Sequence, residues 1–340
     1  MKTIANITLA VILFAASISV SAQSRFVVQN GQNSQVFGTF ALALAATQAG
    51  DTLYMPGGTF NIGTIYIDHT LTLVGVGHYP DYTSATGITW LNGSIFLRTG
   101  ADHSLLQGFY LTGDVRLGNN SSTQNVNNVT ISRCNVGNIQ LYASAPATAE
   151  QILISENVVR GTIVGGDAQN VLIEKNLAHN IQSFNNNVLI SNNIIFKPTG
   201  DTFNYLTSCL IQNNIILHTG SYLFYGSSSN TIANNIFVRD FAMPGSNNGS
   251  GNIGSQPLNT IFVNFEGSTF NYEFDFNLQE TSPGKNAATD GNDIGIYGTV
   301  IPYKEGAVPF NPNITFQQIS TVTDQEGNIE VEVNVSAQER

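Results

Sequence analysis

Six short segments between residues 128 and 238 decide the fold: NVTISRCNV (128–136), QILISENVV (151–159), NVLIEKNLA (170–178), NVLISNNII (187–195), CLIQNNIIL (209–217) and NTIANNIFV (230–238). Each consists of an alternating apolar segment, an asparagine and a second apolar segment. The aligned asparagines, separated by 22, 19, 17, 21 and 21 residues, are Asn135, Asn157, Asn176, Asn193, Asn214 and Asn235. A period of about 20 residues without helical patterning indicates a β-solenoid.

The recurring asparagine is best interpreted as part of the scaffold. Apolar residues at alternate positions of a strand point to one side, so the apolar side chains of all copies can face one common core. An asparagine at one corner of every coil can bond to the amides above and below it, and it tolerates left-handed backbone. We therefore predict an asparagine ladder. Cys134 and Cys209 lie about four coils apart, too far for a disulfide at roughly 4.8 Å per coil, and we predict two buried, unreactive thiols.

Residues 1–22, MKTIANITLAVILFAASISVSA, have the features of a secretory signal peptide. Lys2 provides the positive end, an apolar run follows, and Val20-Ser21-Ala22 form a small-residue cleavage site. The apolar run is shorter than the roughly 18 residues that a membrane span requires. We expect a secreted protein, extracellular or at the cell surface, with no integral membrane segment in the mature chain.

The composition restricts the classes of partner. Only 10% of the residues are charged, and the formal net charge is −11. Nucleic acids and anionic membranes need clustered cations, so neither is expected as a partner. The balance fits a rigid extracellular β-protein, which we expect to be a monomer that meets an extracellular polysaccharide or a cell-surface component.

A helix is predicted before the first coil, where an open apolar end would otherwise be exposed. We expect it to begin after a cap at Asn33 or Ser34 and to end near Gln48. Its apolar stripe, at helical spacing, consists of Phe37, Phe40, Ala41 and Leu44.

The order of these segments resembles a known family. A capping helix, then GDTLYMPGGTF (50–60), then LTLVGVG (71–77), then NVTIS-type coils is similar to the right-handed parallel β-helix proteins of bacterial type, which include pectate lyases and other secreted polysaccharide-active proteins. The resemblance implies an all-β, right-handed parallel β-helix, which we assign to residues 23–300. SPGKNAATDGNDIGIYGT (282–299) resembles the element that closes many bacterial β-helices.

Residues 301–340 are assigned to a small C-terminal β extension. DQEGN (324–328) is a hairpin turn, and Ile329, Val331, Val333 and Val335 alternate with polar residues. We expect the face with the glutamates to meet solvent. The unit would either cover the C-terminal end of the solenoid or pack along its side.

A column of cations follows the second strand of successive coils. Its members, three or four residues after the aligned asparagine, are Arg160, His179, Lys197, His218 and Arg239. The aromatic residues of the stretches that follow are Tyr142, Phe184, Tyr205 and Tyr225. Together they would line a groove for an extended anionic or neutral glycan. Alternatively, the cations are solvated corner residues that deter edge association.

The resemblance implies a polysaccharide lyase, whose site needs a base and carboxylates that hold calcium. Lys197 or Arg160 would be the base, with His179 and His218 in support. The acidic residues are scattered over different columns, so no carboxylate cluster supports Ca²⁺ as a cofactor, and no spacing indicates a zinc site.

Two functions from different classes follow. One is a secreted protein that binds or cleaves an extended polysaccharide along the side of the solenoid. The other is a non-catalytic structural or adhesive protein of the cell surface. Enzymatic activity stays open at this point, because one fold hosts many functions.

Overall fold

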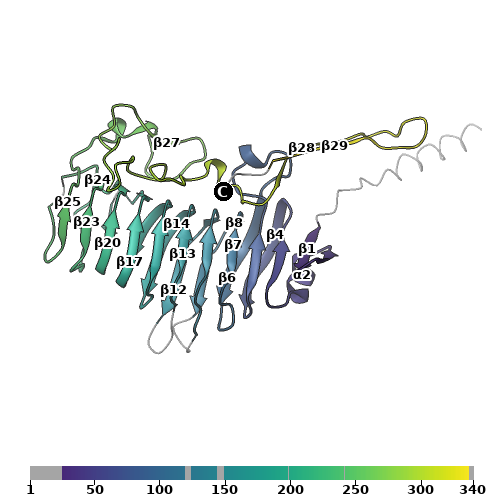
Figure 1. Ribbon diagram of the computed structural model, residues 1–340, viewed down its shortest axis with the longest axis horizontal. Coiled ribbons are helices and arrows are strands. Elements are labelled where there is room, and N and C mark those ends of the chain that lie inside the picture. Colours follow the sequence, from purple (N-terminus) through teal and green to yellow (C-terminus); the bar gives the residue numbers. More distant parts are fainter. Residues whose placement is uncertain (1–24, 119–123, 144–148, 198, 241, 337–340) are drawn as a thin grey trace, which may run out of the picture.

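The computed structural model describes residues 25–118, 124–143, 149–197, 199–240 and 242–336. They form an all-β parallel solenoid with one helix and a C-terminal antiparallel hairpin (Figure 1). The expected signal peptide, residues 1–22, lies outside the described residues. No helix within those ranges is long and apolar enough to cross a membrane.

Two long sheets run along the solenoid. Sheet A, in the order in which its strands pair, contains β2 (Asn33–Phe37), β1 (Phe26–Asn30), β3 (Asp51–Tyr54), β5 (Leu71–Val74), β7 (Leu105–Gln107), β10 (Thr130–Ser132), β13 (Leu153–Ser155), β15 (Val171–Glu174), β17 (Asn185–Ser191), β20 (Thr207–Gln212), β23 (Thr231–Ala233) and β25 (Asn248–Ser250). Sheet B contains β4 (Gly58–Ile67), β6 (Thr89–Leu97), β8 (Tyr110–Leu111), β9 (Val115–Gly118), β11 (Asn135–Val136), β12 (Ile139–Ala143), β14 (Val158–Gly166), β16 (Leu177–Gln182), β18 (Ile194–Ile195), β21 (Ile215–Ile216) and β24 (Ile236–Phe237).

Smaller elements connect and cover these sheets. They are α2 (Phe40–Ala46), the 3₁₀ turns η1 (Asp81–Thr83), η2 (Leu258–Thr260) and η3 (Glu305–Ala307), and the strand pairs β19 (Asp201–Thr202) with β22 (Tyr222–Leu223), β26 (Phe262–Asn264) with β27 (Asp275–Leu278), and β28 (Asn313–Ile319) with β29 (Val331–Ser336).

The repeats stack in register to form the core. One inward position of sheet A holds an isoleucine in six successive coils, each of them fully buried: Ile131, Ile154, Ile173, Ile190, Ile211 and Ile232. The same alternation in every copy gives every coil the same inward face, so the core is continuous along the axis.

The N-terminal end is covered, but the predicted helix is too long. Residues 33–37 form strand β2, which pairs antiparallel with β1 through a turn at Gly31 and Gln32. Gly31 is the first residue of this two-residue turn, and glycine suits that position because its φ is positive, at 56°. The helix α2 begins after Thr39, whose hydroxyl accepts a bond from the Leu42 N–H at 3.3 Å.

The cap packs on the first coils through aromatic side chains. Phe40 and Ala43 of α2 are buried, whereas Ala41 of the predicted stripe is exposed. Phe26 of β1 contacts the Phe40 ring at 5.9 Å and the Phe60 ring at 4.8 Å between centroids. The hairpin and the helix therefore close the apolar end together.

The asparagine ladder is confirmed from Asn157 onward. Asn157 Nδ2 donates to Asn176 Oδ1 at 3.0 Å, and the same bond repeats along the column to Asn235. Asn193 Nδ2 also donates to the carbonyls of Ile173 and Ser191, at 2.9 and 3.0 Å. The ladder extends one step beyond the repeats, because Asn235 Nδ2 donates to Asn252 Oδ1.

Asn135 is not part of this ladder, so that part of the prediction is wrong. β10 pairs with β13 so that Thr130 lies opposite Leu153, which places Cys134 at the ladder position. The Cys134 N–H accordingly donates to Asn157 Oδ1 at 3.0 Å. Asn135 is one residue further, where its side chain bonds outside the column. Both cysteines are free and buried, as predicted, and burial raises the pKa of each thiol to about 12.

The residue before each ladder position forms a second column, here called the left-handed column. Its members all have a φ between 52° and 58°: Arg133, Glu156, Lys175, Asn192, Asn213 and Asn234. Such backbone turns the chain sharply at the corner and favours asparagine and glycine.

The left-handed column holds the segment after β27, residues 282–308, here called the return segment. Asn234 Nδ2 donates to the Ala287 carbonyl at 2.8 Å, and Arg133 donates to the Val308 carbonyl at 2.7 Å. Later residues thus meet earlier coils, and the chain runs back along the corner of the solenoid (Figure 1). The element that was expected to close the helix lies within this segment and covers its side.

The C-terminal hairpin of β28 and β29 packs against the side of the solenoid at its base, where Asn313 and Ile314 line a pocket with Tyr54 and Val74, and the rest of it extends away. Asp324 N–H donates to the Asn328 carbonyl at 2.9 Å, which confirms the predicted turn. Both faces are exposed from Thr315 to Ser336, apart from the partly buried Ser320, and the exposed residues include Val331, Val333 and Val335. In Figure 1 the hairpin extends away from the solenoid on the side of α2.

Candidate functional site

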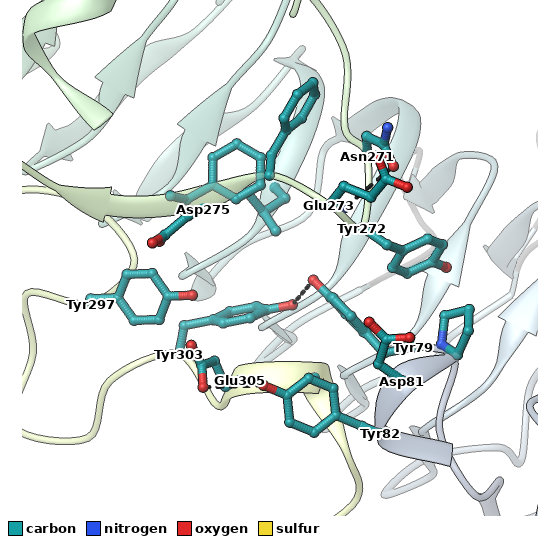
Figure 2. A pocket seen from close by; sticks show the side chains of 15 residues that line it. Tyr79, Asp81, Tyr82, Asn271, Tyr272, Glu273, Asp275, Tyr297, Tyr303 and Glu305 are labelled. Atoms are coloured by element: carbon teal, nitrogen blue, oxygen red, sulfur yellow. Dashed lines mark hydrogen bonds between the residues drawn. The ribbon is translucent and has the colours of Figure 1, made fainter. Parts of the chain in front are cut away.

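Three irregular segments converge above sheet B and enclose a cavity of about 570 Å³. They are the insertion between β5 and β6, the segment that leads into β27, and the return segment. Figure 2 shows that their side chains surround this cavity. We call it the tyrosine pocket, and define it by its five tyrosines and four carboxylates: Tyr79, Tyr82, Tyr272, Tyr297, Tyr303, Asp81, Glu273, Asp275 and Glu305.

Local backbone chemistry places the insertion at the rim. Pro80, directly before η1, has a φ of −56°, the value that its ring imposes, and the Thr83 hydroxyl donates to the Tyr79 carbonyl at 2.8 Å. Gly306 has a φ of 71°, and a Cβ there would lie 2.3 Å from Cγ of Tyr82. Glycine therefore lets the return segment approach the Tyr82 ring closely.

The tyrosine rings pack edge to face. Tyr79 contacts Tyr272 at 4.7 Å, and Tyr297 contacts Tyr303 at 5.9 Å between centroids, both near perpendicular. Their two groups are joined by a hydrogen bond of 3.0 Å between the hydroxyls of Tyr79 and Tyr303 (Figure 2). This arrangement presents both ring faces and ring edges, a geometry that aromatic clusters favour.

Burial keeps the tyrosine hydroxyls protonated. It raises the pKa of Tyr79, Tyr297 and Tyr303 well above the ordinary value, and that of Tyr272 to about 12. The charges of Glu305 and Asp275 raise the pKa of Tyr297 further. These hydroxyls are therefore neutral donors and acceptors at neutral pH.

The carboxylates lie among the rings. Tyr82 donates its hydroxyl hydrogen to Glu305 Oε2 at 3.1 Å. Asp275 Oδ1 accepts bonds from the N–H and the side-chain amide of Asn277, at 2.9 and 2.8 Å, which fix its orientation. Asp275 lies beside Tyr297 (Figure 2), and Asp81 lies close enough to Tyr82 to raise the pKa of its hydroxyl.

One wall of the pocket is anchored to the coils through a buried network. His78 is fully buried, and its Nδ1 lies 3.2 Å from the Tyr272 hydroxyl. Burial, together with the charge of Arg160, lowers the pKa of His78 to about 3, so the ring is neutral. Asn135 Nδ2 donates to the same hydroxyl at 2.9 Å. Asn135, predicted as a ladder residue, thus positions Tyr272.

Arg160, one of the two predicted bases, is held by several partners. It donates to Asn135 Oδ1 and to the carbonyls of Leu111 and Thr112, the latter two at 2.8 and 3.0 Å. Its guanidinium lies 4.4 Å from the centroid of the Tyr110 ring. Burial lowers its pKa, and the neighbouring tyrosines oppose this shift. These contacts explain its position without a ligand.

The five predicted cations divide between two columns. Val159, Ala178, Ile195, Ile216 and Phe237 stack in register in sheet B. Arg160 and His179 follow that row by one residue. Lys197, His218 and Arg239 follow it by two residues. The loose alignment in the sequence therefore reflects two different positions on the coil.

Their surroundings differ as well. His218 is fully buried, its Nδ1 lies 3.1 Å from the Thr202 hydroxyl, and burial lowers its pKa. His179 is half-buried, and burial and then the charge of Lys197 lower its pKa. Lys197 and Arg239 are both partly exposed.

The predicted aromatic residues also separate. Phe184 is fully buried in the core, so it cannot contact an external ligand, and the side chain of Tyr142 lies outside the described residues. Tyr205 and Tyr225 are brought together, with centroids 5.9 Å apart. Tyr222, absent from the prediction, joins them at 6.0 Å from Tyr225. All three are more than half exposed, at 54%, 57% and 52% for Tyr205, Tyr222 and Tyr225.

Sequence reasoning missed the tyrosine pocket altogether. Five of the chain's 12 tyrosines line it. The signal lay in two clusters of aromatic and acidic residues that interrupt the repeat, YPDY (79–82) and NYEFDF (271–276). A comparison of equivalent positions in successive coils does not identify these clusters, because neither of them recurs from coil to coil.

Within the described residues, no group of three or more histidine, cysteine, aspartate and glutamate side chains could hold a metal ion. No protein-family model, curated protein or solved structure matches this chain significantly.

Proposed function

We propose that this chain is an exported carbohydrate-binding β-helix protein that holds a segment of a glycan in the tyrosine pocket. One observation carries the proposal: three segments far apart in the sequence enclose a cavity of about 570 Å³ and supply its tyrosines and carboxylates. Ligand sites of small molecules are concave, partly preformed and often of about 300–1,000 Å³.

The lining suits a sugar ring. A pyranose has faces of C–H bonds that pack on aromatic rings, and a rim of hydroxyls that need acceptors and donors. Tyr79, Tyr297 and Tyr303 offer both ring surface and neutral hydroxyls. Glu305 and Asp275 are acceptors for sugar hydroxyls. The amino-terminal 22 residues and the β-helix support an extracellular place of action.

Binding is the part of the hypothesis that the geometry supports. The lyase hypothesis has less support, since Arg160 is bonded to Asn135 and to two backbone carbonyls. The structural or adhesive alternative makes a different prediction, namely that no free oligosaccharide binds to the pocket.

The test compares two exposed tyrosines. Tyr82 of the pocket and Tyr66 of sheet B are 45% and 49% exposed, so neither replacement should disturb folding. A glycan array with the secreted chain would identify ligands, and titration calorimetry would measure their affinity. We expect Tyr82→Ala to weaken binding on the order of tenfold, and Tyr66→Ala to leave it unchanged. Absence of any glycan ligand, or equal affinities of the two variants, would overturn the proposal.

A further inference from the structure

We infer that the tyrosine pocket selects a positively charged sugar, a glucosamine-type unit with a free amine, over neutral N-acetylated and anionic uronic sugars. This inference rests on the proposed carbohydrate binding. It predicts a cationic ligand, whereas the cation column predicts an anionic or neutral glycan. It starts from the composition of the lining, which has four carboxylates and, among its described residues, no lysine, arginine or histidine.

Within the part of the chain that the structure describes, the four pocket carboxylates form no ion pair with a basic side chain. They are Asp81, Glu273, Asp275 and Glu305. Lys304 adjoins Glu305 in the sequence, but it does not line the cavity. Arg160 is also absent from the lining, and Asn135 and a backbone carbonyl hold its guanidinium.

The pKa shifts of the tyrosine hydroxyls indicate which carboxylates lie near which rings. Glu305 raises the pKa of both Tyr82 and Tyr297, after the larger effect of burial. Asp275 acts on Tyr297, and Asp81 on Tyr82. Negative charge therefore lies on both sides of the cavity, between the rings (Figure 2).

Aromatic faces and carboxylates favour the same kind of ligand. The face of a tyrosine ring is the negative part of its quadrupole and attracts an ammonium group within about 6 Å of the centroid. An ammonium group also donates three hydrogen bonds, and it needs acceptors such as Glu305 and the tyrosine hydroxyls. A uronic carboxylate would meet only like charge. An N-acetyl group would remove the positive charge from the amine.

The test uses three trisaccharides at about pH 6, where an aliphatic amine carries a proton. They are the glucosamine trisaccharide, its fully N-acetylated form and trigalacturonate, each titrated into the secreted chain by calorimetry. We expect the glucosamine form to bind at least about tenfold tighter than the acetylated form, and trigalacturonate not to bind detectably.

Matched variants assign the preference to the pocket. Glu305→Gln keeps the shape and removes one charge, so the glucosamine trisaccharide should lose about tenfold in affinity while the acetylated form is unaffected. Glu280→Gln changes an exposed glutamate outside the pocket and should have no effect. Circular dichroism and melting of both variants should match the parent chain.

The outcomes separate the two hypotheses. Equal affinity for the glucosamine and acetylated trisaccharides, or tighter binding of trigalacturonate, would overturn the charge preference and leave carbohydrate binding in place. Trilysine, titrated in the same way as a fourth ligand, tests for a basic peptide. Tighter binding of trilysine than of the glucosamine trisaccharide would also overturn the preference for an amino sugar. If none of the three trisaccharides binds, the charge preference is overturned, and the glycan array decides whether carbohydrate binding in this pocket fails as well.

Discussion

The ladder column and the left-handed column are neighbours in the sequence, yet they have opposite roles. The ladder holds an asparagine in each coil from Asn157 to Asn252, and every amide bonds to the next. The left-handed column, one residue earlier, varies from Arg133 and Glu156 to Asn234. The ladder column faces the interior of the corner, and the left-handed column holds the return segment on the outside.

The difference shows why one column repeats and the other does not. A ladder residue meets an identical neighbour above and below, so the same side chain serves in every coil. A residue of the left-handed column meets whichever part of the return segment lies opposite. Lys175 Nζ donates to the Ile301 carbonyl, whereas Asn213 bonds to Thr289. Variation in a column is thus a sign of a unique partner.

The largest expected effect tests the left-handed column at Arg133. This side chain is 1% exposed and forms a buried ion pair with Glu156 at 3.1 Å. Its guanidinium also lies 3.5 Å from the centroid of the Phe310 ring. Arg133→Ala would leave a buried carboxylate without its cation, so we expect a loss of about 3–5 kcal/mol in the free energy of unfolding, measured by chemical denaturation.

A double replacement shows whether the charge is the cause. Arg133→Met combined with Glu156→Leu removes both charges, and it should recover a large part of the loss. A loss below about 1 kcal/mol for Arg133→Ala would show that this column contributes little and that the return segment is held elsewhere.

The ladder is tested at Asn193, in the middle of the column. Asn193→Ala would remove the donor to Asn214 Oδ1 and to two backbone carbonyls, and it leaves their partners unpaired in a buried corner. We expect a loss of about 1–3 kcal/mol in the free energy of unfolding. Asn259→Ala, an exposed asparagine, should change it by less than about 0.5 kcal/mol. Similar melting of the two variants would exclude a stabilising ladder.

The smallest effect is expected at Asn213, where the two columns can be separated. Its side chain exchanges two hydrogen bonds with Thr289, at 3.0 and 2.9 Å. Asn213→Gly removes them without backbone strain, because glycine accepts the φ of 58°. We expect a loss of about 0.5–1.5 kcal/mol and faster amide hydrogen exchange near Thr289.

The matched control is Asn128→Gly, at a similar φ of 57° and away from the return segment. It should leave hydrogen exchange near Thr289 unchanged. If both variants exchange alike there, the contact between Asn213 and the return segment is not what holds that segment in place.

The repeat made most of the fold predictable, and the errors fell where the repeat is imperfect. The copy around Asn135 was aligned by its asparagine, and the register of β10 with β13 moved it by one residue. The predicted helix begins too early because Phe37 continues the apolar stripe, whereas residues 33–37 pair with β1 across the turn at Gly31. Strand pairing decided both cases, and pairing partners are not visible within one segment.

The candidate site is harder to predict from the sequence than the fold is. Cations such as Arg160 and Lys197 were found because they recur, and recurrence favours the scaffold and its corners. The tyrosine pocket uses each of its residues once. Tyr79 and Tyr303 are 224 residues apart in the sequence and share a hydrogen bond. Without the path of the return segment, nothing connects them.

By itself, the sequence determined the parallel solenoid, its apolar core and the asparagine ladder, because these depend on a local pattern that repeats about every 20 residues. The tertiary structure alone decided where the return segment lies and what it encloses. That path depends on single contacts between distant residues, such as Arg133 with Val308. Contacts of this kind have no period, so they leave no regular trace in the sequence.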